Sequence, residues 1–134
     1  MIDLENVLSK NSALQLSSVT LAFIGDAVHS LYVRKNLVFE KDEKGAVLNK
    51  KASDIVRASA QADFIDKILP ILNEEEVEVY KRARNTKKGT RAKNATVGEY
   101  NKATGFEALV GFLYLTGQKE RLNYLLSYGE NDEN

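Results

Sequence analysis

Proline occurs only once in this chain, at Pro70, so very little in the sequence forces a helix to end. Proline removes a helical hydrogen bond and clashes with the preceding turn, and its near absence therefore favours long helices. No window alternates polar and apolar residues for long enough to make a convincing strand. The sequence thus predicts an all-α fold. Its 134 residues fit one domain, 1–134, and exclude a two-domain enzyme with a separate cofactor fold.

Capping residues and helix breakers divide the chain into expected helices with short polar connections. Ser18 or Thr20 can cap the first helix, and Asn94 or Thr96 can cap the one around Glu107. Asn73 is followed three residues later by a glutamate, which is the pattern of a capping box. The first expected helix begins at residues 18–20 and ends at residue 38, and the others cover residues 46–69, 74–87, 97–117 and 118–128. An acidic tail, about 129–134, is expected to be disordered.

The residue types missing from the chain exclude several kinds of active site. There is no cysteine, which excludes a disulfide framework, a thiolate zinc site and a cysteine nucleophile. His29 is the single histidine, so a multi-histidine metal site is excluded too. The longest uncharged apolar run, residues 108–115, is too short to span a membrane, and the N-terminus lacks the features of a secretory signal. We therefore expect a cytoplasmic protein.

Two stretches are nearly free of charge, and each contains a single carboxylate. Asp26 is the only formal charge in residues 11–33, and Glu107 is the only one in residues 103–118. The helix around Asp26 is apolar on almost every side, so we expect it to be central and buried. An unpaired carboxylate in such surroundings costs several kcal/mol or takes up a proton.

Two interpretations of these carboxylates remain open at this point. In the first, each is a cap or pairs with an arginine such as Arg34, Arg57 or Arg84. In the second, they bind a hard divalent cation such as Mg²⁺, which prefers oxygen ligands and can promote displacement at a phosphodiester. The small neighbours of the two acids leave room for close helix approach or for a ligand; they are Gly25, Ala27, Gly105, Ala108 and Gly111.

Charge is balanced overall but unevenly distributed. Residues 81–93, KRARNTKKGTRAK, hold seven basic residues and no acidic one. The segment leads into the Glu107 stretch, which favours contact with phosphates, and it lacks aromatic residues that stack on single-stranded bases. A solvated helix end is the alternative. The predicted nucleic-acid contacts are Arg84, Asn85, Lys87, Lys88, Arg91 and Lys93, with Lys50, Lys51 and Arg57 as weaker candidates.

His29 follows Asp26 by three residues, on the same side of the expected helix. It can reach Asp26 or a bound phosphate. A single histidine in such a place is more often a hydrogen-bonded structural residue, and both roles stay open.

Three segments resemble signatures of one enzyme family. FIGDAV, at 23–28, is similar to the FLGDAV signature of the ribonuclease III catalytic domain, and ATGFEALVGFLYL, at 103–115, is similar to its second signature. RARN, at 82–85, resembles an element that precedes the second signature. Order and spacing agree over roughly residues 19–126. The segments LYVR, KRARN, KNATVGEY and LYLTGQKERL, together with the absence of a double-stranded-RNA-binding domain, most resemble the Mini-III subclass, which consists of the catalytic domain alone.

The resemblance implies the all-helical ribonuclease III endonuclease fold, a homodimer, and Mg²⁺-dependent hydrolysis of both strands of an RNA duplex. Each subunit would contribute one metal site, with Asp26 and Glu107 as catalytic and metal-binding residues, at the floor of a shared valley. The resemblance also implies maturation of the precursor of large-subunit (23S) ribosomal RNA, with a ribosomal protein as a further partner that presents the substrate.

The sequence departs from the full-length ribonuclease III pattern at two acids. Ala22 stands where the family has an acid before Asp26, and Thr104 stands where it has one before Glu107. Fewer anionic ligands should bind Mg²⁺ more weakly and leave more of its shell to water and RNA phosphate. The same departures keep open a non-catalytic duplex-RNA-binding or ribosome-assembly module on this fold. A helical protein-interaction domain is the remaining alternative.

Overall fold

The computed structural model describes residues 4–86 and 95–130. Within these ranges the chain folds into helices joined by turns and short extended segments, without a strand, which confirms the predicted all-α fold. None of the helices in this part of the chain is long and apolar enough to cross a bilayer. The helices are α1 (Lys10–Leu14), α2 (Ser18–Glu40), α3 (Gly45–Val56), α4 (Ala58–Ile68), a 3₁₀ turn (Leu69–Ile71), α5 (Glu74–Arg84), α6 (Val97–Leu115) and α7 (Lys119–Leu126).

Side-chain caps begin the long helices where the sequence predicts them, within a residue or two. Ser17 caps α2, one residue before the predicted Ser18, by accepting a hydrogen bond from the Thr20 amide at 3.1 Å. Asn73 forms the predicted capping box at the start of α5. Thr96 forms another at the start of α6. Each cap satisfies a backbone amide that the first turn of a helix leaves without a partner.

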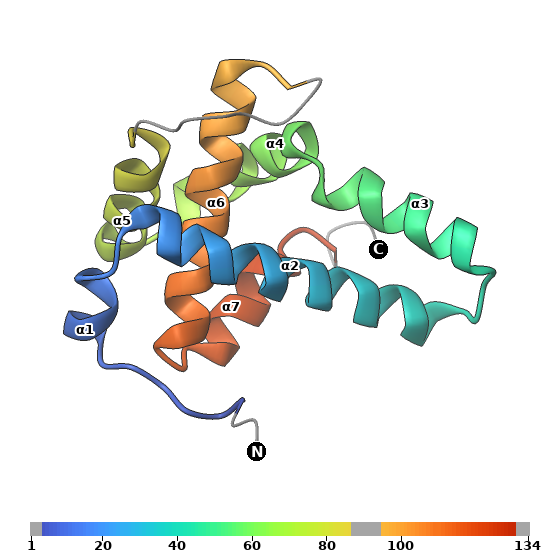
Figure 1. Cartoon of the computed structure of the whole chain (residues 1–134), viewed down its shortest axis with the longest axis horizontal. Coiled ribbons are helices and arrows are strands. Elements are labelled where there is room, and N and C mark those ends of the chain that lie inside the picture. The colour runs from blue at the N-terminus through green and yellow to red at the C-terminus, as the bar shows by residue number, and fades with distance from the viewer. Residues whose placement is uncertain (1–3, 87–94, 131–134) are drawn as a thin grey trace.

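The expected helix over residues 46–69 is wrong in one respect, because it is broken at Arg57. This residue is extended (φ −64°, ψ 155°), so α3 ends at Val56 and α4 begins at Ala58. Neither glycine nor proline marks the break. It lets α3 follow the far end of α2 while α4 turns to pack on α6 (Figure 1). Tertiary packing therefore overrides local helix propensity at this position.

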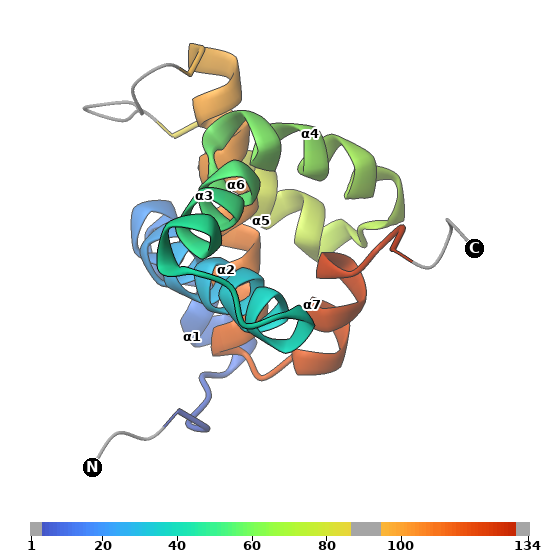
Figure 2. The same cartoon turned by 90° about the vertical axis from the view of Figure 1, so that its right-hand side faces the viewer.

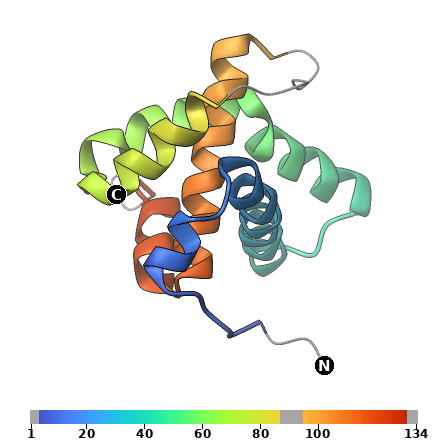
Figure 3. The ribbon, with the colours of Figure 1, turned by 60° about the vertical axis from the view of Figure 1, so that its left-hand side comes forward.

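Helix α6 is the centre of the fold. It buries ten of its 19 residues and contacts α2, α4, α5 and α7 (Figures 1 and 3). Phe106, Leu109, Phe112 and Leu113 are each at most 1% exposed. A fully buried side chain of this size stabilises a fold by about 1.5–3 kcal/mol, so the all-round apolar character of α6 is explained by burial within one subunit.

Helix α2 differs from this pattern, and its predicted burial on all sides is wrong. Leu21 and Val33 face the core, but Phe23 is 81% exposed and Leu31 is 65% exposed. Asp26 lies on the exposed side as well. The helix therefore presents one apolar side to α6 and leaves exposed apolar residues on another side within a single chain. Figure 2 gives the view nearly along the axis of α2.

Two glycines let α2 and α6 cross with their backbones in contact. A methyl group on Gly25 would lie 1.7 Å from the Glu107 carbonyl oxygen, and one on Gly111 would lie 2.0 Å from the Leu21 carbonyl oxygen. No side chain fits in those spaces. Of the two explanations for the small residues, close helix approach is correct at Gly25 and Gly111.

Candidate active site

The close crossing of α2 and α6 brings the two lone carboxylates together. Asp26 follows Gly25 on α2, and Glu107 lies on α6 at the point that Gly25 contacts. The two carboxyl groups lie close enough for Asp26 to raise the pKa of Glu107. Two acids that are 81 residues apart in the sequence thus form one cluster, because the backbones of their helices touch.

The proposed ion pairs with arginine are not found. Within residues 4–86 and 95–130, neither Asp26 nor Glu107 makes a salt bridge. Arg34 donates to Ser30 at 3.1 Å instead, and Arg57 lies 3.9 Å from Asp54. The cluster therefore has two carboxyl groups and no neighbouring cation from the described part of the chain.

This environment changes the ionisation of Glu107. Burial, followed by the hydrogen bond and the charge of Asp26, raises the pKa of Glu107 to about 8, while a hydrogen bond from Gln61 acts in the opposite direction. At neutral pH the Glu107 carboxyl is therefore largely protonated. A bound divalent cation would supply the positive charge that such a pair lacks, and its preference for oxygen ligands matches the donors present.

Gln61 is a third member of the site, and the sequence analysis missed it. Its side chain is 3% exposed and lies between His29 and Glu107. The amide Nε2 is 3.0 Å from His29 Nδ1 and 3.4 Å from Glu107 Oε2. One signal was available, since Gln61 shares a helical stripe with Ile65 and Ile68, which are both fully buried.

His29 is a buried, hydrogen-bonded residue rather than a free base. It is 6% exposed, and its ring packs edge-on against Phe106 with a centroid distance of 4.9 Å. Burial lowers the pKa of His29 to about 4, against the opposing charge of Asp26, so the imidazole is neutral at physiological pH. Its Nδ1 contact is with Gln61. These contacts favour the structural interpretation over a direct phosphate contact.

The two positions that lack the family's acids offer no substitute ligand. Ala22 has no polar side-chain atom, and the Thr104 hydroxyl donates to the Tyr100 carbonyl oxygen at 3.0 Å. No group of three or more potential metal-binding side chains occurs among the residues that the structure describes. A cation at this site would have Asp26 and Glu107 as its only acidic ligands in that part of the chain.

The predicted nucleic-acid contacts fall into two groups. Lys87, Lys88, Arg91 and Lys93 lie outside the described residues. Arg84 lies over the ring of Tyr80, and its Nε donates to Asn85 at 3.2 Å. Tyr80 in turn contacts α6 at Gly105, two residues before Glu107. The end of α5 is therefore connected to the carboxylate site through Tyr80.

The weaker basic candidates are bound to carboxylates of the same chain. Lys50 lies 2.7 Å from Asp54, Lys51 pairs with Glu43, and Arg57 also approaches Asp54. These pairs give no support to a phosphate contact at α3.

Arg82, in the RARN segment, has a structural function. It donates to the carbonyl oxygens of Leu14 and Leu16, at 2.8 and 3.0 Å, and to the Ser18 hydroxyl at 3.1 Å. The residue therefore fastens the turn before α2 to α5. By fixing the start of α2 it helps to place Asp26 against α6.

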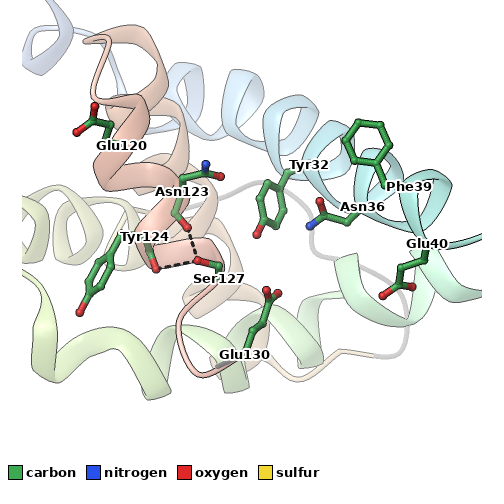
Figure 4. A pocket seen from close by; sticks show the side chains of 9 residues that line it. All are labelled: Tyr32, Asn36, Phe39, Glu40, Glu120, Asn123, Tyr124, Ser127 and Glu130. Carbon is green, nitrogen blue, oxygen red and sulfur yellow. Dashed lines mark hydrogen bonds between the residues drawn. The ribbon is translucent and has the colours of Figure 1, made fainter. Parts of the chain in front are cut away.

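A hollow of about 770 Å³ lies between α2 and α7, away from the carboxylate pair (Figure 4). Neither Asp26 nor Glu107 lines it, and three of its lining side chains are glutamates: Glu40, Glu120 and Glu130. Negative charge of this kind repels phosphates. The hollow therefore does not suit the predicted nucleic acid.

Comparisons with known proteins place the chain in a family. The sequence pattern of the ribonuclease III domain matches residues 19–118. The chain is 46% identical to a mini-ribonuclease 3 of Thermoanaerobacter sp. (strain X514), over 92% of this chain and 88% of that protein. It is 42% identical to a mini-ribonuclease 3 of Clostridium tetani, over 94% and 87% of the two chains. A crystal structure of a Fusobacterium nucleatum protein superposes with a TM-score of 0.81 at 33% identity, covering 90% of this chain and 96% of the other. The chain therefore belongs to the ribonuclease III family of endoribonucleases.

Proposed function

We propose that the protein is a Mg²⁺-dependent endoribonuclease that cleaves double-stranded RNA. The carboxyl pair of Asp26 and Glu107 is the observation that carries the proposal. The two side chains meet where α2 and α6 cross at Gly25, and Asp26 helps to raise the pKa of Glu107. No salt bridge within the described residues supplies a positive charge to either carboxyl group. Perturbed carboxyl pairs of this kind occur preferentially at functional sites.

Asp26 and Glu107 would hold the metal ion and are the proposed catalytic residues. When bound, Mg²⁺ supplies the charge that activates water and stabilises the phosphodiester during displacement. The chain itself fixes the two carboxyl groups, since Gly25 and Gly111 set the helix crossing and Gln61 binds one oxygen of Glu107. With alanine and threonine in place of two further acids, the remaining ligands would be water and RNA phosphate.

The basic segment is the proposed RNA contact. Arg84 and Asn85, at the end of α5, lead into Lys87, Lys88, Arg91 and Lys93, and all of these precede the helix that bears Glu107. Contacts to phosphate do not depend on base sequence, so this segment would bind duplexes of many sequences.

We further propose a homodimer in which a second copy covers the exposed side of α2. Val19, Phe23, Leu31 and Val38 lie along one strip of α2 and are 57%, 81%, 65% and 59% exposed. Several exposed large apolar side chains on one helix are typical of an interface. Asp26 lies on the same helix, so the two sites of a dimer would face one shared substrate, as cleavage of both strands requires.

The proposed cellular substrate is the precursor of large-subunit (23S) ribosomal RNA, in the cytoplasm, with a ribosomal protein as the partner that presents it. Membership of the ribonuclease III family and identity to mini-ribonuclease 3 proteins support this assignment. The 1–134 chain would act as a single catalytic domain.

The proposal is tested by incubating the purified protein with an RNA duplex, a matching single strand and a DNA duplex, each with Mg²⁺ or with EDTA. We expect Mg²⁺-dependent cleavage of the RNA duplex alone, and none by Asp26→Asn. Duplex binding without cleavage would instead support a non-catalytic ribosome-assembly module. The replacement of two family acids by Ala22 and Thr104 favours that alternative. Undiminished cleavage by Asp26→Asn would overturn the assignment of the site.

A further inference from the structure

Gln61 is a buried polar residue with two hydrogen-bond acceptors around one amide nitrogen. Its Nε2 lies 3.0 Å from His29 Nδ1 and 3.4 Å from Glu107 Oε2. An amide nitrogen carries two hydrogens, so one can be directed to each acceptor. A polar group at 3% exposure is costly to bury unless it is bonded in this way. The three residues therefore form a hydrogen-bond network across α2, α4 and α6.

The contact with His29 indicates which atoms of this network donate and which accept. An amide nitrogen only donates, so the imidazole Nδ1 must accept and the ring hydrogen must sit on Nε2. The edge-on contact with Phe106 holds the ring in place. With the ring hydrogen on Nε2, His29 Nδ1 accepts from the Gln61 amide nitrogen, and this tautomer favours the orientation of Gln61 in which the same nitrogen donates to Glu107.

The donated hydrogen bond orients Glu107. A carboxyl group rotates easily about its last bond, and fixing one oxygen fixes the plane of both. The proposed metal site has only two acidic side chains, so the direction in which each presents its oxygens matters more than in a site with four. Residues that orient metal ligands in this way typically change metal affinity about 10- to 100-fold when they are replaced.

We propose that Gln61 is a positioning residue for Glu107, and that His29 acts through Gln61 by fixing the orientation of its amide. This inference rests on the proposed function, since it assigns these residues to the metal site formed by Asp26 and Glu107. Neither residue touches the reacting atoms in this scheme. Both act by holding one carboxyl oxygen in place.

The test compares Gln61→Met with a matched control, Gln118→Met. Methionine is close to glutamine in size but donates no hydrogen bond. Gln118 also lies in a partly buried place and donates from Nε2, to Thr116 at 2.8 Å, but at the far end of α6. We expect Gln61→Met to raise both the Mg²⁺ concentration for half-maximal cleavage and the dissociation constant for Mn²⁺, measured by electron paramagnetic resonance without RNA, about 10- to 100-fold. Cleavage at saturating metal should fall less, and the control should match the parent protein.

A double-mutant cycle separates positioning from general packing. If His29 acts through Gln61, then His29→Leu raises the half-saturating Mg²⁺ concentration, and combining it with Gln61→Met adds nothing further. Additive effects, or unchanged metal requirements in folded Gln61→Met, would overturn the inference. If Gln61→Met does not fold, as judged by circular dichroism, His29→Leu decides alone: an unchanged metal requirement refutes the scheme. Asp26→Asn is assayed in parallel to tell the two hypotheses apart. If the proposed function is wrong, Asp26→Asn cleaves as fast as the parent protein. If only the inference about Gln61 is wrong, Asp26→Asn has lost cleavage.

Discussion

Glu76, in the first turn of α5, is buried, and Glu107, in the middle of α6, is half-buried, but their surroundings are opposite. Glu76 is 1% exposed and accepts hydrogen bonds from Arg121 at 2.7 and 2.8 Å and from the Asn73 amide at 2.9 Å. Glu107 has a second carboxyl group and Gln61 beside it, but no arginine or lysine from the described residues.

The two environments shift the two pKa values in opposite directions. Burial alone would raise the pKa of Glu76, but the hydrogen bonds from Arg121 and Asn73 and the charge of Arg121 outweigh it, so the pKa is lowered. For Glu107, burial and Asp26 act together and raise the pKa to about 8. A buried acid with its own cation helps to hold α5 and α7 together. A half-buried acid without one, next to another acid, is suited to a cation from solution.

The largest predicted effect is on activity at Glu107. Glu107→Gln should lower the rate of duplex RNA cleavage by on the order of 10³-fold or more, because it removes one of two acidic ligands of the proposed metal site. The folded state should keep its stability, since the amide retains a hydrogen-bonding group without a buried acid. Single-turnover cleavage and urea denaturation measure the two quantities. Strong destabilisation with normal cleavage would reverse the roles assigned to Glu76 and Glu107.

The next effect is on stability at Glu76. Arg121→Met leaves Glu76 buried without a cation and should cost about 3 kcal/mol of unfolding free energy. Replacing both partners, as in Glu76→Met with Arg121→Met, should recover much of the loss, because no charge then remains buried. Urea denaturation of the single and double variants checks this. A double variant no more stable than Arg121→Met would show that packing, rather than the unpaired charge, accounts for the loss.

The pH dependence of stability should separate the two glutamates by sign. The lowered pKa of Glu76 gives stability that is present above its ordinary pKa and is lost as the pH falls below it. The raised pKa of Glu107 gives stability that is complete below its ordinary value of 4.5 and is lost progressively as the pH rises from there to about 8.

Denaturation midpoints between about pH 3 and pH 10, in EDTA, test these signs. Glu76→Gln should flatten the profile on its acidic side, and Glu107→Gln should flatten it between about pH 4.5 and pH 8. Mg²⁺ should restore stability near pH 8 in the parent protein only. The comparison fails if Glu107→Gln leaves the profile between about pH 4.5 and pH 8 unchanged.

Different features of Glu76 and Glu107 could be predicted from the sequence. The Asn73–Glu76 capping box is local, so the residue spacing was enough to predict it. The partner Arg121 lies 45 residues away, and nothing in the spacing connects it to Glu76. Asp26 and Glu107 were singled out because they are isolated charges in apolar helices, and the structure brings them together. Their metal-binding and catalytic roles stay predictions.

What could not be predicted depends on how helices pack. Gln61 shares a helical stripe with Ile65 and Ile68, which indicates burial, but its contacts with two other helices could not be predicted from that stripe. The break at Arg57 lacks the glycine or proline that would indicate it. The exposed side of α2 was predicted as buried, because an apolar strip looks the same in sequence whether it faces the core or a second subunit.

The smallest effect is expected for an acid that is paired but exposed. Asp66 lies 2.8 Å from Lys102, joining α4 to α6, with side chains that are 48% and 38% exposed. In water the attraction between such charges is screened, and ordering two flexible side chains opposes it. Asp66→Asn should therefore leave both the urea midpoint and the cleavage rate unchanged within error, at low and high salt. A loss as large as that of Arg121→Met would show that pairing alone, and not burial, decides whether an acid stabilises this fold. The contrast between Glu76 and Glu107 would then need another cause.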